Sequence, residues 1–321
     1  MRTTKIFSRR TTLLAGAGLA LGATVLPAAA QPPAQQRTPE NEERWARMGV
    51  ALTGKTALVT GSTDGLGKEV ARQLGALGAL VIVHGRNQER GEEVVRAIRA
   101  AGGEAVFYRA DFASFAAVEA FAAQIREQHD RLDLLINNAA AVSGPQRQTS
   151  ADGHELALAV NYLAPFLLTY RLLPLLEASA PARVVNVSSL GQTPLDFADI
   201  MMERSYNPGD AYRRSKLAQI MFTIDLAAEL DAAKVTVNSL HPARSMNTAR
   251  VINGGFQPLS TVEEGAEATM QLAVSPELRA RTGLYFNGLA EARANAQAYD
   301  EAARARLRAL SLELTGLTDR S

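Results

Sequence analysis

A tyrosine and a lysine lie four residues apart in a stretch with helical periodicity. They are Tyr212 and Lys216, in the sequence Tyr-Arg-Arg-Ser-Lys within the expected helix 211–230. Residues four apart share one face of a helix, so the ammonium group can act on the phenol. A free phenol has a pKa of about 10, and a nearby fixed cation lowers that pKa by favouring the phenolate. The pair predicts a proton donor or acceptor near neutral pH, although the spacing alone also fits an ordinary amphipathic helix.

Other polar residues precede this pair along the chain. The expected strand 183–188 leads into the hydroxyl of Ser189, and Asn161 lies in the sequence Val-Asn-Tyr-Leu-Ala-Pro-Phe. Ligands of a parallel sheet bind at the carboxyl ends of its strands. We therefore expect these groups to meet Tyr212 in one site.

A glycine-rich loop follows the first expected strand and opens the first expected helix. Its sequence, from residue 60 to residue 67, is Thr-Gly-Ser-Thr-Asp-Gly-Leu-Gly. Glycines let the backbone turn tightly and approach a pyrophosphate, whose charge is met by N–H groups and the helix dipole. A plain strand-to-helix turn is the alternative. The residues expected to bind a dinucleotide here are Gly61, Ser62, Thr63, Gly65, Leu66 and Gly67.

The end of the second strand indicates which dinucleotide binds. An acidic residue there would bind a free ribose, whereas a basic residue would pair with a 2′-phosphate. The sequence is His-Gly-Arg-Asn, and Arg86 offers a planar fork suited to phosphate. NADP(H) is therefore predicted over NAD(H), with a solvated helix-start residue as the alternative reading of Arg86. We also expect Asp111 and Phe112 to flank the adenine, and Asn138 and Ala139 to leave room for the cofactor's ribose.

The elements that must position these groups alternate regularly. Short, nearly continuous apolar runs, typical of strands covered on both faces, alternate with longer helical stretches. This order predicts a single α/β domain: a doubly wound, Rossmann-type parallel sheet of about seven strands with helices on both faces. The expected strands are 56–60, 80–84, 105–109, 132–137, 183–188, 234–240 and 283–286. The expected helices are 66–77, 88–101, 115–128, 151–176, 211–230, 262–274 and a tail at 290–314.

Composition excludes several other kinds of protein. The chain has 321 residues, and its 34 basic and 33 acidic side chains give a formal charge of +1, so no global field attracts nucleic acid. The absence of cysteine rules out disulfides and thiolate nucleophiles, and with 4 histidines no metal site is expected. The expected partner is a small molecule, and a homo-oligomer is compatible with the sequence.

The first thirty residues have the layout of an export signal. A basic start precedes an uncharged stretch rich in Ala, Gly and Leu, which ends in small residues before Gln31. This layout is typical of a signal peptide. Arg9 and Arg10 resemble the twin-arginine signal, whose substrates cross the bacterial inner membrane already folded. We expect the twin-arginine export machinery to deliver the protein to the periplasm, with an uncleaved inner-membrane anchor as the alternative.

The expected organisation has three parts. Residues 1–30 form the signal peptide, and residues 31–51, rich in Pro and Gln at their start, form a flexible lead-in. Residues 52–321 form the NAD(P)-binding domain. No stable membrane insertion is expected after cleavage.

Taken together and in this order, the motifs resemble the short-chain dehydrogenase/reductase family. The resemblance covers roughly residues 52–248 and rests on the glycine loop, on Asn-Asn-Ala at 137–139, and on the four polar residues Asn161, Ser189, Tyr212 and Lys216. It implies a general acid/base role for Tyr212 and a Lys216 that lowers the tyrosine's pKa and holds the nicotinamide ribose. It further implies that Ser189 hydrogen-bonds the substrate oxygen and that Asn161 fixes a water relaying protons to Lys216.

Two segments depart from the common family pattern. His-Pro-Ala at 241–243 replaces the usual Pro-Gly, which moves the cofactor-contacting hydroxyl to about Thr248. The insert 190–211 is longer than in many relatives and resembles the branch of retinol dehydrogenases, the WW-domain oxidoreductase and protochlorophyllide reductases. These relatives act on lipophilic carbonyls or alcohols. Apolar residues of the insert suit such a pocket or, equally, packing beneath a long loop: Phe197, Ile200, Met201 and Met202.

The resemblance predicts an NADP-dependent oxidoreductase that transfers a hydride between the nicotinamide and a carbonyl or alcohol. The cofactor supplies the hydride chemistry, and the protein supplies orientation and electrostatics. A non-catalytic NADP-binding sensor or scaffold is the alternative, because a fold does not fix a function. A serine hydrolase is disfavoured because Ser189 lacks a glycine two residues earlier.

Overall fold

The computed structural model describes residues 44–142 and 144–318. The expected signal peptide and residues 31–43 of the expected lead-in lie outside the described residues. The packed chain begins before the boundary expected at Leu52. Trp45, in the helical residues 44–47, is 1% exposed and packs in a hydrophobic core. An indole ring buries a large apolar area, which holds this end of the lead-in against the domain.

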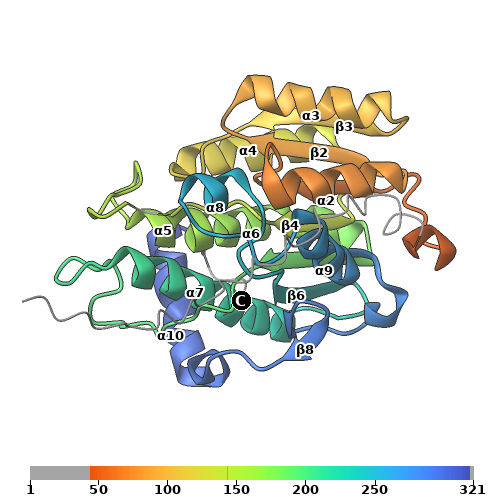
Figure 1. The fold of residues 1–321 in the computed structure, drawn as a ribbon. Coiled ribbons are helices and arrows are strands. Elements are labelled where there is room, and N and C mark those ends of the chain that lie inside the picture. Colours follow the sequence, from red (N-terminus) through yellow and green to blue (C-terminus); the bar gives the residue numbers. More distant parts are fainter. Residues whose placement is uncertain (1–43, 143, 319–321) are drawn as a thin grey trace, which may run out of the picture. The chain divides into compact units, whose positions relative to one another are not determined.

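One sheet of eight strands runs through the fold in the order β3-β2-β1-β4-β5-β6-β7-β8 (Figure 1). Neighbouring strands are parallel except β7 and β8. The doubly wound, single-domain α/β fold is therefore confirmed, with one antiparallel strand more than expected. The strand order turns back between β1 and β4, where ligands of such sheets bind. The strands are β1 (Thr56–Val59), β2 (Leu80–Gly85), β3 (Glu104–Arg109), β4 (Leu134–Asn137), β5 (Ala182–Val187), β6 (Val235–His241), β7 (Tyr285–Asn287) and β8 (Ala290–Ala292).

Helices cover both faces of the sheet, and each face has its own hydrophobic core. One core lies under α2 (Gly65–Ala76), α3 (Gln88–Ala100) and α9 (Val262–Val274). The other lies under α4 (Phe115–Gln128), α6 (Ala164–Ala178), α7 (Pro208–Glu229) and α10 (Glu301–Thr315). The shorter elements are α5 (Leu156–Leu158), the π turn η1 (Ala159–Leu163), α8 (Ala249–Asn253), and the 3-10 turns η2 (Pro276–Leu278) and η3 (Ala296–Tyr299).

Polar residues fix where the main helices start. The side chain before the first helical residue accepts a backbone N–H at α2, α3, α4, α7 and α9, which satisfies a donor that the helix itself leaves unpaired. A polar residue therefore precedes the first residue of each of these five helices. The capping residues are Asp64, Asn87, Ser114, Asn207 and Thr261.

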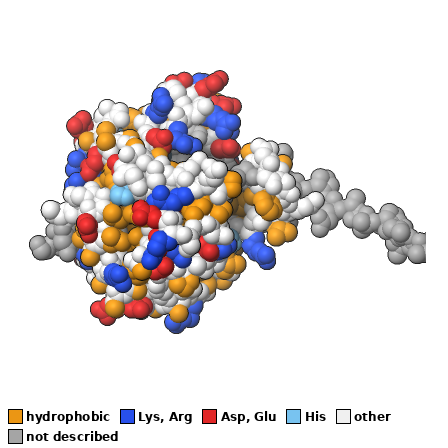
Figure 2. Space-filling view, turned by 90° about the vertical axis from the view of Figure 1, so that its left-hand side faces the viewer, with side chains coloured by type: hydrophobic (Ala, Val, Ile, Leu, Met, Phe, Trp, Pro, Cys, Tyr) orange, Lys and Arg blue, Asp and Glu red, His pale blue; other side chains and the backbone are white. Residues whose placement is uncertain are grey.

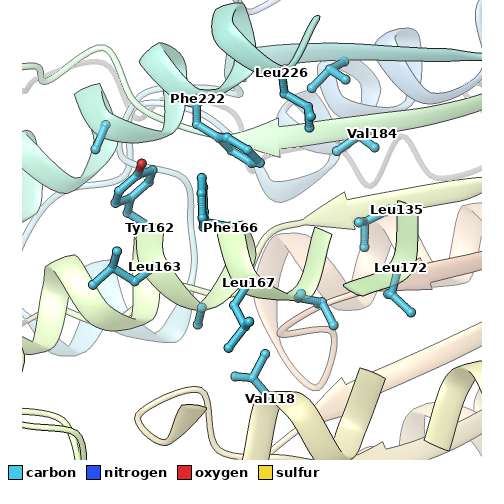
Figure 3. Packing of buried hydrophobic residues seen from close by; sticks show 14 of the residues in the cluster. Val118, Leu135, Tyr162, Leu163, Phe166, Leu167, Leu172, Val184, Phe222 and Leu226 are labelled. Atoms are coloured by element: carbon cyan, nitrogen blue, oxygen red, sulfur yellow. The ribbon is translucent and has the colours of Figure 1, made fainter. Parts of the chain in front are cut away.

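The core between α6 and α7 positions the catalytic candidates of α7 and of the preceding π turn η1. Phe166 of α6 and Phe222 of α7 face each other with ring centroids 5.1 Å apart (Figure 3). Tyr162 closes one end of this aromatic group, and its hydroxyl hydrogen-bonds Ser311 of α10 at 2.6 Å. Buried aromatic pairs of this kind stabilise a fold beyond their area alone. The packing fixes α7 against α6.

Two expected helices were wrong in part. The helix expected at 151–176 begins at Leu156 and contains the π turn η1. Pro165 has no N–H to donate to the carbonyl four residues earlier, so regular α-helical bonding is interrupted there. The tail expected as one helix from 290 to 314 starts instead as β8, whose pairing with β7 overrides the helix propensity of its alanines.

On the face shown in Figure 2, basic and acidic side chains are interspersed, with apolar side chains between them. Among the described residues, one helical run, Leu156–Ala178, is long and apolar enough to cross a membrane by length and composition. However, 89% of its apolar window is buried inside the fold, as in the core helix of a sheet protein.

Candidate active site

A cleft of about 760 Å³ opens at the carboxyl ends of the parallel strands. Residues from the phosphate loop, from the ends of β2, β4, β5 and β6, and from α7 all line it. The structure thus brings together most of the residues singled out in the sequence. Those in the cleft wall are Gly61, Thr63, Gly65, Leu66, Gly67, Arg86, Asp111, Phe112, Asn138, Ala139, Ser189, Tyr212, Lys216 and Thr248. Ser62 and Asn161 do not line it.

The phosphate loop has a shape that requires glycine at two positions. Gly61 has φ +65°, and a Cβ there would lie 2.8 Å from the Ala139 Cα. A Cβ on Gly67 would lie 2.4 Å from both the Gly61 carbonyl oxygen and the Asn138 Nδ2. The Asn138 amide donates to the Thr60 carbonyl at 2.8 Å and to the Gly61 carbonyl at 3.1 Å, which fixes the loop. A loop of this form at a helix N-terminus fits a pyrophosphate.

Ser62 supports the loop from beneath. Its side chain is buried, and its hydroxyl donates to the Val59 carbonyl at 2.7 Å and accepts the His84 N–H at 3.0 Å. The Ser62 hydroxyl thus ties the end of β1 to β2 and does not line the cleft, and a contact between Ser62 and the cofactor stays a prediction.

The rim of the cleft carries the groups expected around the adenosine. Arg86 is exposed at the end of β2, and Asp111 accepts the Ala113 N–H at 3.0 Å. Thr248 reaches the phosphate loop, since a Cβ on Gly65 would lie 3.2 Å from its Cγ2. Thr248, in the loop after β6, thus lines the cleft beside the phosphate loop, and its contact with the cofactor stays a prediction.

Lys216 and Tyr212 lie on the inner face of α7. Lys216 is 2% exposed. Its ammonium group donates to the Val187 carbonyl and to the Gln219 Oε1, both at 2.8 Å. It lies 5.7 Å from the centroid of the Tyr212 ring. A buried cation is held in place by such acceptors. The geometry therefore keeps a positive charge close to the phenol ring.

The two consecutive serines after β5 have different hydrogen-bond partners. Ser188 is buried, and its hydroxyl donates to the Lys216 carbonyl at 2.6 Å, which ties β5 to α7. Ser189 accepts the Gly191 N–H at its Oγ, at 3.1 Å, so its own hydrogen can be donated elsewhere. The carbonyl of Ser189 accepts the Tyr285 hydroxyl at 3.0 Å, which anchors the residue to β7.

Asn161 sits fully buried within the π turn. Its Oδ1 accepts the Ala141 N–H at 2.7 Å, and its Nδ2 donates to the Ala141 carbonyl at 3.0 Å and to the Ser215 Oγ at 2.9 Å. Both amide hydrogens are thus used to hold the loop after β4 against α7. A water relay at this residue stays a prediction, and it cannot use those amide hydrogens.

The four apolar residues singled out in the insert 190–211 pack against hydrophobic cores and are not among the residues that line the cleft. Phe197 and its neighbours Ile200 and Met201 lie against the core beneath α7, and Met202 is 3% exposed beside Ala211. Of the two alternatives for the insert, the structure favours packing. The apolar wall of the cleft comes from other segments whose role sequence reasoning missed: Leu156, Val160, Met246, Val251 and Phe256.

A doubly wound sheet with a glycine loop and a Tyr-Lys pair in one cleft defines a nicotinamide-dependent oxidoreductase of the Rossmann type. The model of the short chain dehydrogenase family matches residues 55–251. The chain belongs to this family, and it is an NAD(P)-dependent oxidoreductase acting on a small molecule.

Similar proteins cover most of the chain. Retinol dehydrogenase 14 of Homo sapiens is 38% identical over 295 residues, covering 83% of this chain and 88% of that protein. The crystal structure of an uncharacterised Mycobacterium paratuberculosis protein has a TM-score of 0.70 at 28% identity, covering 83% of this chain and 95% of that one. A short chain dehydrogenase of Shigella flexneri, complexed with NADP, has a TM-score of 0.63 at 26% identity and covers 75% of this chain and 99% of its own.

Proposed function

We propose that the protein is an NADP(H)-dependent oxidoreductase that interconverts a lipophilic carbonyl compound and its alcohol, with Tyr212 as general acid/base. The observation that carries the proposal is the shared cleft: Tyr212, Lys216 and Ser189 face the same space as the glycine loop. The retinol dehydrogenase relatives support this class of substrate.

The protein's own residues have separable tasks in this reaction. Tyr212 donates a proton to the carbonyl oxygen during reduction and accepts it during oxidation. Lys216, buried and fixed by Val187 and Gln219, stabilises the phenolate electrostatically. Ser189, oriented by the Gly191 N–H, donates its hydroxyl hydrogen to the substrate oxygen and fixes its position. The nicotinamide, when bound, supplies or accepts the hydride.

The cofactor would be held at both of its ends. The loop of Gly61, Gly65 and Gly67 would bind the pyrophosphate, and Arg86 would pair with the 2′-phosphate. Asp111 and Phe112, which line the cleft after β3, would flank the adenine. An exposed arginine at the end of β2, with no carboxylate beside it in the sequence, supports NADP(H) over NAD(H).

The first test measures oxidation of NADPH with aldehydes and ketones of increasing chain length, and the reverse reaction with the matching alcohols. Because part of the cleft wall is apolar, each added methylene that it buries is expected to raise kcat/KM by about fourfold, until the substrate fills the cleft. Val251→Ser should reduce kcat/KM for the longest substrates and change it little for the shortest. If the protein binds NADPH but none of the compounds causes its oxidation, the result would instead support the sensor. If kcat/KM does not change with chain length, the result would contradict a lipophilic substrate.

We further propose that the enzyme folds and binds NADP(H) in the cytoplasm and is then exported with its cofactor. The observation behind this is the pair Arg9 and Arg10 before an apolar stretch, since that export route accepts folded cargo. Replacing both arginines by lysine should leave active, unprocessed protein in the cytoplasm. Cell fractionation and cofactor analysis of the periplasmic protein measure this. Export unaffected by the lysine pair, a mature protein without cofactor, or a chain retained in the inner membrane would each contradict the proposal.

A further inference from the structure

The histidine at the end of β2 makes contacts that its place in the sequence does not predict. His84 is 3% exposed and lines the cleft between the phosphate loop and the adenine side. Its Nδ1 accepts the N–H of Gly61 at a distance of 3.1 Å. Gly61 is the first glycine of the phosphate loop and has a positive φ. An imidazole nitrogen therefore fixes the residue that begins the turn.

The backbone of His84 holds the same loop. Its carbonyl accepts the Ser62 N–H at 2.9 Å, and its N–H donates to the Ser62 Oγ at 3.0 Å. The next residue along β2, Gly85, lies against the loop as well, because a Cβ there would be 2.5 Å from the Thr63 Cγ2. The end of β2 and the phosphate loop thus form one connected unit.

The ring of His84 also supports the adenine side of the cleft. It stacks on Phe112 with centroids 4.2 Å apart and an interplanar angle of 26°, and it contacts Phe121 at 4.7 Å. Burial lowers the pKa of His84 to about 3, against the opposing effects of the Ala110 backbone and the Asp111 charge. The ring is therefore neutral at physiological pH, and its unprotonated Nδ1 is available as an acceptor.

We propose that His84 is a positioning residue for the dinucleotide: its Nδ1 preorganises the phosphate loop through Gly61. This rests on the proposed cofactor site. A loop that is already ordered binds without the entropic cost of fixing it, so the contact acts on cofactor affinity although His84 carries no charge to pair with phosphate.

The test is the Kd for NADPH, measured by calorimetry on wild type, His84→Leu and His84→Asn. Leucine removes the acceptor and leaves the Gly61 N–H unpaired, so Kd is expected to rise about tenfold or more. Asparagine places its Oδ1 where Nδ1 lies, so Kd should return to within about threefold of wild type. Ile82→Ala, a core substitution in the same strand, controls for lost stability: it should lower Tm with little effect on Kd.

A second measurement needs no substitution. In the ¹⁵N spectrum of the wild type, His84 should show the tautomer with hydrogen on Nε2 from about pH 5 to 8, coupled through Nδ1 to the Gly61 amide. Hydrogen on Nδ1, a His84→Leu Kd within about twofold of wild type, or an asparagine variant as weak as the leucine variant would overturn the inference. Wild type that binds neither NADPH nor NADH would instead overturn the cofactor site itself.

Discussion

Tyr212→Phe is expected to lower kcat/KM by at least about 100-fold while changing the Kd for NADPH by less than about twofold. Positioned acid/base groups contribute about 10²–10⁴ to rate, and a hundredfold loss corresponds to about 2.7 kcal/mol of transition-state stabilisation. The substitution removes only the hydroxyl, and it keeps the ring that lies 5.7 Å from the Lys216 ammonium. Steady-state kinetics and cofactor titration of the same preparation measure both quantities.

Tyr206→Phe provides the matched control. It makes the same chemical change in the insert before α7, where the hydroxyl donates to the Gly144 carbonyl at 3.1 Å, outside the cleft wall. That variant should retain kcat/KM within about threefold of wild type. If Tyr212→Phe keeps more than about a tenth of wild-type kcat/KM, Tyr212 is not the main acid/base.

Arg86→Asp is expected to weaken NADPH binding by about 10- to 100-fold and to narrow or reverse the preference over NADH. A charge-assisted contact to the 2′-phosphate would be lost, and the new carboxylate would repel that phosphate while accepting hydrogen bonds from a free ribose. The arginine is exposed at the rim, so its replacement should leave the fold intact. Kd values for NADPH and NADH at one stated ionic strength measure the effect.

Arg96→Asp separates the local contact from the change in overall charge. This residue lies on α3 and is not among the residues lining the cleft, and its ion pair with Glu92 is long, at 4.0 Å between exposed side chains. Long-range charge effects are screened within about a Debye length, so NADPH affinity should change by less than about threefold. Equal affinities of the wild type for NADH and NADPH would contradict the proposal that Arg86 pairs with the 2′-phosphate.

Local sequence patterns predicted most of the fold because local rules place most of its elements. Continuous apolar runs identified the seven parallel strands, and the longer helical stretches between them identified helices such as α3 and α4. The exceptions depend on partners distant in the sequence. β8 exists because it pairs with β7, and Trp45 is ordered because a core lies beneath it.

In the candidate site, too, some features follow from local spacing and others depend on tertiary packing. Spacing alone predicted that Tyr212 and Lys216 share a helix face and that a glycine loop follows β1, since both depend on neighbours a few residues apart. The family resemblance added Ser189, but Ser188 and Ser189 have the same chemistry, and only packing shows that the first ties down Lys216.

The sequence by itself thus determined the parallel sheet and the order of its motifs, because these follow from periodicity and short-range spacing, and the resemblance of those motifs to a known family indicated the class of enzyme. Only the tertiary structure decided which side chains face the cleft. It buried Ser62 and Asn161, packed Phe197 against the core and placed His84 against the phosphate loop. Each of these outcomes depends on hydrogen-bond and packing partners that are far apart in the chain or on another strand, which no local pattern specifies.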